Sequence, residues 1–249
     1  MWPSDNFFLK SIIAISLFSM VQTGHAQIVK IGKQIWMASN LNTNTFSDGS
    51  TIPEARSEED WSKAGIEKKP AWCYFQNDST NVHFLGRLYN WYAISNPAKV
   101  CPAGWHVPDD GEFKQLELFL GLDSVELDAR KDSRGAVNKI GAQLKATTEL
   151  WGSEISDVDG KSGFRAFPGG MRNPFGEFSS NPLAFFWTSS SPKPVKVDGG
   201  KRWSQNHICR VIFGDGIMRE EVLASQGFSV RCIQDSQQKL NTTKQMRGK

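Results

Sequence analysis

The sequence predicts an α+β fold, in which helices lie in the first half of the domain and short strands fill the second half. Amphipathic helical periodicity is present before residue 121 and fades beyond residue 150. Apolar or alternating runs bounded by turn residues follow instead. The 22 glycines and 11 prolines also favour many turns over long helices.

The domain is expected to open with a β-hairpin. Apolar runs at 28–31 and 34–37 flank Gly32 and Lys33. Glycine at the first position of a two-residue loop suits a type II′ turn, which joins antiparallel strands.

Two short helices are expected next. Acidic residues at 58–60 precede Trp61 and predict the first of them. Leu88, Trp91 and Tyr92 lie at positions i, i+3 and i+4, which predicts a helix that stops before the proline at position 97.

The best-supported helix follows Asp109 or Asp110, either of which suits an N-cap, and Gly121 can end it. Its apolar face carries Phe113, Leu116 and Leu120. Its solvent face is expected to carry Lys114, Gln115 and Glu117. The carboxylates at its start are explained by capping and by the helix dipole, without an acid–base role.

The C-terminal third is expected to supply strands. The run 185–190 predicts a buried strand, and 210–213 and 217–219 predict a hairpin around the turn at 214–216. Residues 227–232 alternate and predict a closing strand. One side of that strand carries Phe228, Val230 and Cys232, and the other carries Ser229 and Arg231.

Residues 1–26 have the features of a secretory signal peptide. Lys10 precedes an apolar run at 12–21, and small residues precede the expected cleavage after Ala26. A membrane-spanning helix needs roughly 20 apolar residues, so a transmembrane segment is not expected. We therefore expect a secreted, periplasmic or cell-surface protein.

The mature chain is expected to form one domain over residues 27–235, followed by a disordered polar tail at 236–249. The net charge of +3 is small, and no concentrated basic stripe is present. Nucleic acid is therefore not an expected partner.

Six motifs occur in an order that resembles a known family. They are WCYF (72–75), GRLYNWYA (86–93), CPAGWHVP (101–108), GFRAFPGGMR (163–172), FWTSS (186–190) and GFSVRC (227–232). Together they resemble the Fibrobacter succinogenes major paralogous domain, which is abundant in exported proteins of Bacteroidetes-type bacteria. A more distant resemblance is to formylglycine-generating and sulfatase-modifying enzymes.

The resemblance implies a C-type-lectin-like fold, with two helices packed on twisted, mostly antiparallel sheets that are joined by long loops. The four cysteines of an exported chain favour disulfides, and sequence alone leaves three connectivities open. The implied fold brings Cys101 close to Cys232, so we expect these two to pair. A second disulfide between Cys73 and Cys209 is then possible.

The chemistry of the resembling enzymes and lectins is not visible in the sequence. The enzymes use a copper-binding cysteine pair a few residues apart, and no such pair occurs here. The calcium-site triplets of sugar-binding lectins, Glu-Pro-Asn or Gln-Pro-Asp with Trp-Asn-Asp, are also missing. The segment 157–160 lacks the later glutamate of a calcium loop, and His106 is interpreted as a structural histidine. No catalytic residue, metal or cofactor is expected.

Residues 201–207 are the candidate ligand surface. Trp61, Trp151 and Trp203 lie in polar stretches outside the motifs, where an exposed indole suits contact with a sugar or a protein. The candidate ligand-binding side chains are those of Arg202, Trp203, Asn206 and His207. Ordinary loop packing is the competing interpretation.

These observations predict a non-catalytic binding or envelope-associated module, which is exported and recognises a glycan or a surface protein. Loops between about Pro174 and Ser225 are expected to present the ligand surface. The alternative is a degenerate relative of the formylglycine-generating enzymes that retains some catalytic activity. The missing cysteine pair argues against that alternative.

Overall fold

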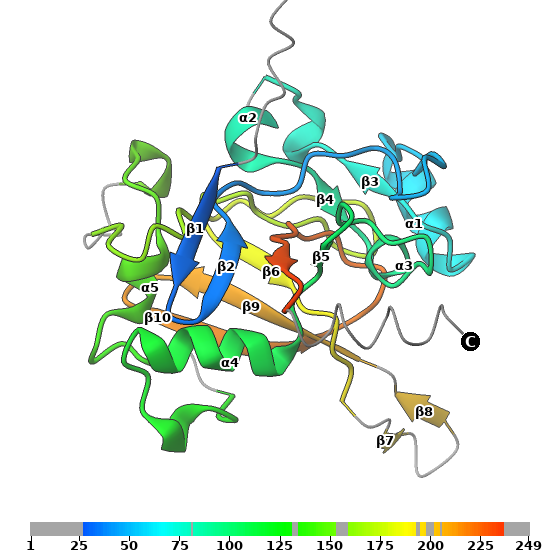
Figure 1. The fold of residues 1–249 in the computed structure, drawn as a ribbon. Helices are drawn as coiled ribbons and strands as arrows, with labels where there is room; N and C mark the ends of the chain where they lie inside the picture. The colour runs from blue at the N-terminus through cyan, green and yellow to red at the C-terminus, as the bar shows by residue number, and fades with distance from the viewer. Residues whose placement is uncertain are drawn as a thin grey trace, which may run out of the picture.

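The computed structural model describes residues 27–80, 82–130, 134–152, 159–192, 195–197, 202–204 and 206–236 (Figure 1). The expected signal peptide and most of the polar tail lie outside these residues, as do positions 157 and 158. The described chain is a mixed α and β structure with few helices, and every pairing between its named strands is antiparallel. This confirms the predicted α+β class.

The first sheet joins the two ends of the domain. Its strands lie in the order β1 (Ile28–Ile31), β2 (Gln34–Met37), β11 (Ile233–Gln234) and β5 (Trp105–His106). The hairpin β1–β2 is confirmed, and Gly32 has the positive φ of 59° that its turn requires. The last strand of the described chain therefore occupies an interior position between β2 and β5.

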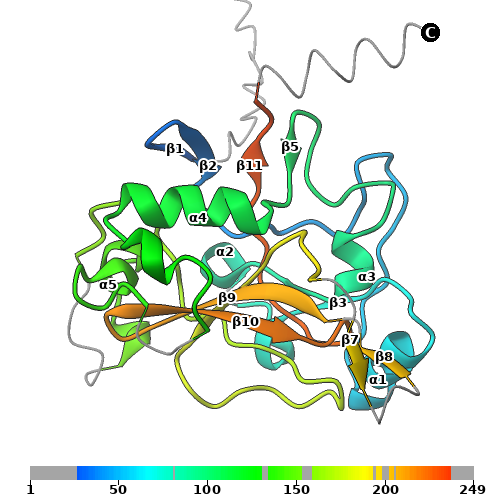
Figure 2. The same cartoon turned by 90° about the horizontal axis from the view of Figure 1, so that it is seen from below.

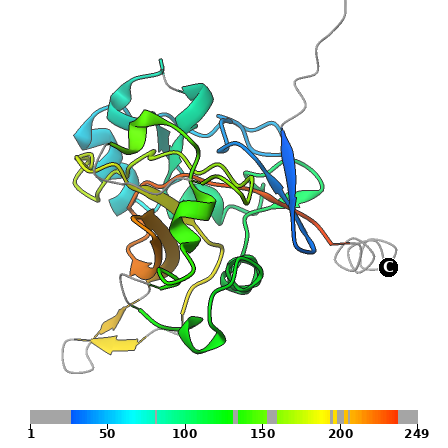
Figure 3. The same cartoon turned by 90° about the vertical axis from the view of Figure 1, so that its left-hand side faces the viewer.

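The second sheet contains β10 (Gly216–Val222), β9 (His207–Phe213) and β6 (Ala184–Trp187), in that order. It confirms the expected hairpin and the expected buried strand. A separate pair, β7 (Val195–Val197) and β8 (Arg202–Ser204), projects away from the body of the domain (Figures 1 and 3).

Helix α4 (Asp110–Phe119) lies between the β1–β2 hairpin and the β9–β10 hairpin (Figure 2). Asp109 is its N-cap, and it forms a capping box with Glu112, so the predicted helix start is confirmed. Phe113 and Leu116 are buried, and the Phe113 ring lies 5.2 Å from the ring of Trp36 on β2. The predicted apolar face is therefore the one that faces the core.

The burial of Glu117 shows that the predicted solvent face of this helix is wrong at this position. Its side chain is fully buried, because Arg134 and Arg210 approach it from outside the helix. The carboxylate accepts hydrogen bonds from Nη2 of Arg134 at 2.6 Å and from Nε of Arg210 at 2.5 Å. Helical periodicity places acidic residues outside, and it cannot foresee cations that come from distant segments.

The helix expected from Leu88 onward begins three residues later. Leu88 and Tyr89 form β4, which pairs with β3 (Trp72–Cys73). Asn90 then caps the short helix α3 (Trp91–Ile94) by accepting a hydrogen bond from the backbone of Ala93. Strand pairing and the Asn90 cap therefore override the helical spacing of this segment.

The other helical segments are short. They are α1 (Glu58–Ile66), which confirms the helix expected after residue 57, together with η1 (Phe75–Asn77), α2 (Val82–Leu85), η2 (Ser124–Glu126), α5 (Ile140–Leu144) and η3 (Glu149–Trp151). In the described part of the chain, no helix has the length and apolar character needed to span a membrane.

Two buried arginines connect irregular segments of backbone. Arg172 donates hydrogen bonds to the carbonyls of Ala55, Arg56 and Gly176. Arg231 binds Asn40 and backbone carbonyls, and its guanidinium lies over the ring of Phe164. Burial lowers the pKa of Arg231 to about 9. The segment 227–232 forms isolated bridges at residues 227–229 instead of the predicted closing strand, and the last described strand begins only at Ile233. Because Arg231 and Ser229 are both buried, this segment also has no solvent face.

Cys101 and Cys232 form the expected disulfide. Cys73 and Cys209 are free and buried, which corrects the second expected pairing. Cys73 packs with Trp61, Ala71 and Leu88, whereas Cys209 packs in a different apolar cluster around Trp187 and Phe228. The two thiols are therefore parts of separate core regions.

Candidate functional site

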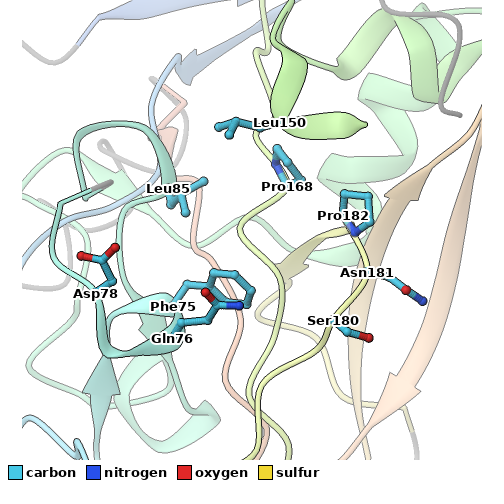
Figure 4. A pocket seen from close by; sticks show the side chains of 9 residues that line it. All are labelled: Phe75, Gln76, Asp78, Leu85, Leu150, Pro168, Ser180, Asn181 and Pro182. Atoms are coloured by element: carbon cyan, nitrogen blue, oxygen red, sulfur yellow. The ribbon is translucent and has the colours of Figure 1, made fainter. Parts of the chain in front are cut away.

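A small pocket lies between two segments that are far apart in the sequence (Figure 4). Its volume is about 240 Å³. One side comes from η1 and α2, the other from the loop at 180–182, and Leu150 and Pro168 close one end. The lining residues are Phe75, Gln76, Asp78, Leu85, Leu150, Pro168, Ser180, Asn181 and Pro182.

Phe75 provides the aromatic wall of this pocket, and Gly170 makes room for it. Gly170 has φ of +62°, and a Cβ atom there would lie 2.2 Å from the Phe75 ring. The ring also makes an edge-to-face contact with Phe178 at a centroid distance of 5.7 Å. Two motifs of the sequence, WCYF and GFRAFPGGMR, therefore meet at this wall.

The backbone beside Phe75 is strained. Gln76 and Asn77 are consecutive residues with φ of 54° and 56°, a conformation that is uncommon for residues other than glycine. The side chain of Asn77 donates a hydrogen bond to the carbonyl of Arg56 at 2.8 Å, which helps to hold the turn. Strain of this kind concentrates where a fold positions side chains for binding or chemistry, and here it orients Gln76 at the pocket.

The polar groups of the pocket are one carboxylate, two amides and one hydroxyl. Asp78 accepts hydrogen bonds from the backbone and the hydroxyl of Thr80, and these bonds lower its pKa, so it is ionised at neutral pH. Within the described chain, the side chains of Gln76, Ser180 and Asn181 form no hydrogen bond with other protein groups. These three side chains retain their donors and acceptors for a ligand.

The structure places the residues of the predicted ligand surface in different surroundings. Arg202 and Trp203 belong to β8, where Trp203 is paired with Lys196 of β7. Asn206 is half-buried, and His207 starts β9. The side chains of Arg202 and Trp203 lie outside the described part of the structure, so a ligand surface around Trp203 stays a prediction.

His207 is buried rather than exposed, which corrects its assignment to a surface. Its ring is stacked on Trp91 at a centroid distance of 3.6 Å, and its Nδ1 lies 2.7 Å from the hydroxyl of Ser191. Burial lowers the pKa of His207 to about 4. Trp61 and Trp151, which lie outside the motifs, are also buried and belong to the core.

The two free thiols are enclosed, and His106 is paired with carboxylates. Burial raises the pKa of the Cys73 thiol and of the Cys209 thiol to about 12, so both are protonated at neutral pH. Nδ1 of His106 lies 2.6 Å from Asp235, and its Nε2 lies 2.9 Å from Glu112, which is the structural role expected of this histidine. Over the described ranges, no group of three or more His, Cys, Asp or Glu side chains is arranged to hold a metal ion.

Sequence reasoning missed most of this pocket. The loop at 180–182 falls inside the interval of about 174–225 that was expected to present a ligand. Gln76 and Asp78 lie a hundred residues earlier, in a polar stretch without periodicity. The usable signal was their position directly after the WCYF motif, in which Trp72 and Cys73 are buried and Tyr74 and Phe75 are half-buried.

These observations define an α+β domain that is closed by one disulfide and carries a small polar pocket. The chain belongs to the Fibrobacter succinogenes major domain family, whose model matches residues 29–234. The family resemblance of the six motifs is thereby confirmed. Comparisons with curated proteins and with solved structures gave no match.

Proposed function

We propose that this protein is an exported, non-catalytic binding module of the cell envelope, and that the pocket beside Phe75 is its ligand site. The observation that carries the proposal is that the exposed polar side chains of Gln76, Ser180 and Asn181 gather next to an aromatic wall. Ligand sites combine apolar walls with a few polar groups that fix orientation, and this pocket has both.

The surroundings of the reactive groups support a role without catalysis. The two free thiols are buried and protonated, and they belong to separate clusters, unlike the closely spaced cysteine pair of the formylglycine-generating enzymes. The ring of His207 is covered by Trp91, and His106 is held between two carboxylates. None of these groups faces the pocket.

The proposal includes a C-type-lectin-like arrangement of the fold. It is supported by the antiparallel sheets, by the long loops between 159 and 183, and by the disulfide that ties the segment before α4 to the closing segment of the chain. In such an arrangement, irregular loops supply the ligand site while helices and sheets hold them in place.

The test is a binding screen of the full chain against arrays of neutral glycans, acidic glycans and peptides. We expect binding that weakens at least roughly tenfold in Gln76→Ala and in Asn181→Ala, the effect of losing a directed hydrogen bond in a site. Asn44→Ala is the matched control, because Asn44 is an exposed asparagine that does not line the pocket.

The same screen separates the pocket from the surface around Trp203. If Trp203→Ala abolishes binding while the two pocket variants bind normally, the pocket is not the ligand site. Copper binding with oxidase turnover would overturn the non-catalytic assignment.

A further inference from the structure

A pair of aromatic rings, one half-exposed and one buried, lies next to residues that line the pocket. The rings of Phe84 and Phe167 are 5.6 Å apart, and about half of the Phe84 side chain is exposed to solvent (51%). Phe84 is the chain neighbour of Leu85, and Phe167 is the chain neighbour of Pro168. Since Leu85 and Pro168 both line the pocket, the contact between Phe84 and Phe167 joins two of its lining segments, and Phe84 is the exposed ring of the two.

The size of the pocket limits what it can enclose. Its volume of about 240 Å³ is below the range of roughly 300–1,000 Å³ that is typical of drug-sized ligand sites. A ligand that fills it is therefore a single small ring or a comparable group. Any larger ligand must continue across the neighbouring surface, where Phe84 offers a flat apolar face.

The charge of the lining selects against anions. Asp78 is the charged residue of the lining, and its hydrogen bonds with Thr80 keep it ionised. No Lys or Arg lines the pocket to compensate it. A sulfated or uronic acid unit would place its charge near that carboxylate and would be repelled.

We propose that the ligand is a neutral oligosaccharide of at least two units, with its terminal ring in the pocket and the next ring stacked on Phe84. The proposal rests on the pocket being the ligand site, as argued above. A sugar ring presents hydroxyl groups that suit the amides and the carboxylate, and it presents a C–H face that suits an aromatic ring.

The same observations disfavour a folded protein as the ligand. A stable protein–protein interface buries roughly 800 Å² on each partner around well-packed apolar anchors. The described surface here is a small polar hollow with one exposed ring beside it. An oligosaccharide suits this surface better, because one of its rings can fill the pocket while the next ring stacks on Phe84.

The experiment measures the affinity of the full chain for neutral cello- and manno-oligosaccharides, from the monosaccharide to the hexasaccharide, by isothermal titration calorimetry. We expect a gain of roughly tenfold from one unit to two, as a moderate aromatic anchor provides. Oligosaccharides longer than two units should gain little further affinity, because the second sugar ring already stacks on Phe84.

Variants of Phe84 isolate the stacking platform. Phe84→Ala should remove the gain from the second unit and leave monosaccharide affinity unchanged, whereas Phe84→Trp should preserve the gain. Phe119→Ala is the matched control, because Phe119 is an exposed phenylalanine on α4, away from this pocket. A chain-length gain that persists in Phe84→Ala would overturn the inference.

Failure of this inference is distinguishable from failure of the proposed site. If affinity depends on Asn181 but not on chain length, the pocket remains the ligand site, and the proposed stacking of a second sugar ring on Phe84 is wrong. If acidic glycans or peptides bind better than neutral oligosaccharides, the assigned ligand class is wrong. Asp78→Asn should raise the affinity for acidic glycans, and no change there would contradict the charge argument.

Discussion

The carboxylate of Glu117 lies 2.6 Å from Nη2 of Arg134, and neither side chain reaches the solvent. The same carboxylate binds Arg210, so one buried anion faces two buried cations. Arg210 also pairs with Asp110 at 2.9 Å, and Asp110 in turn receives two hydrogen bonds from Arg219. Helix α4 is thereby fastened to both strands of the β9–β10 hairpin.

Replacing Glu117 with glutamine should be strongly destabilising. The shape is preserved, but two buried guanidinium groups lose their shared negative charge, which costs about 3–5 kcal/mol of unfolding free energy. Urea unfolding measures the change. Glu59→Gln is the control, since Glu59 is exposed on α1 and its replacement should shift stability by about 0.5 kcal/mol or less. A loss below about 1 kcal/mol for Glu117→Gln would contradict the role of the buried network.

The burial of His207 predicts that the free energy of unfolding decreases in mild acid. Burial lowers its pKa from 6.5 to about 4, so the unfolded chain binds the proton more readily than the folded chain. Stability is therefore retained above the unfolded pKa and is lost as the pH falls toward the folded pKa, by as much as roughly 3 kcal/mol. Urea unfolding at neutral pH and near pH 4 measures this difference.

The variant His207→Phe should flatten that pH dependence, because phenylalanine keeps the stacking on Trp91 and has no proton to gain. His83→Phe is the control, since His83 is exposed. The explanation fails if His207→Phe and the unmodified protein lose stability in parallel as the pH falls.

Thiol counting should give two free cysteines, and only after unfolding. Cys73 and Cys209 are buried and protonated, so a thiol reagent should label neither in the native protein and both in denaturant. Labelling of all four thiols should require reduction of the disulfide between Cys101 and Cys232. That bond joins positions 131 residues apart, and its removal should lower the free energy of unfolding by about 4–5 kcal/mol. Finding no free thiol in denaturant would show that Cys73 and Cys209 are paired after all.

Two glycine substitutions should separate backbone strain from steric conflict at the pocket. Gly49 and Gly170 both have positive φ, but an added Cβ meets nothing within 4 Å at Gly49 and meets the Phe75 ring at Gly170. Gly49→Ala should cost about 1–2 kcal/mol, and Gly170→Ala should cost about 2–5 kcal/mol and weaken ligand binding. Equal losses in thermal unfolding would mean that the Phe75 ring moves away freely.

The sequence predicted the elements that depend on local chemistry. The β1–β2 hairpin follows from Gly32, and the start of α4 follows from the capping preference of Asp109, because neighbouring residues decide both. The pairing of Cys101 with Cys232 depended on the family resemblance. The burial of Glu117 was missed because its cations come from residues 134 and 210, which helical periodicity does not register.

The candidate site was less accessible from sequence for the same reason. Trp203 stood out because an aromatic among polar residues is conspicuous, whereas Gln76 and Asn181 are unremarkable until the fold brings their segments together. His207 was assigned to a surface because its neighbours are polar, but Trp91, more than a hundred residues earlier, covers its ring. Contacts between distant segments decided each of these cases.

The position of β11 also has a consequence for chains that end early. Ile233 pairs with Trp36 on one side and with His106 on the other, so the N-terminal hairpin and β5 share no sheet until the last strand is present. A product truncated before residue 233 lacks this strand and therefore cannot complete the sheet. Chains that stop before residue 233 should therefore remain open to proteases.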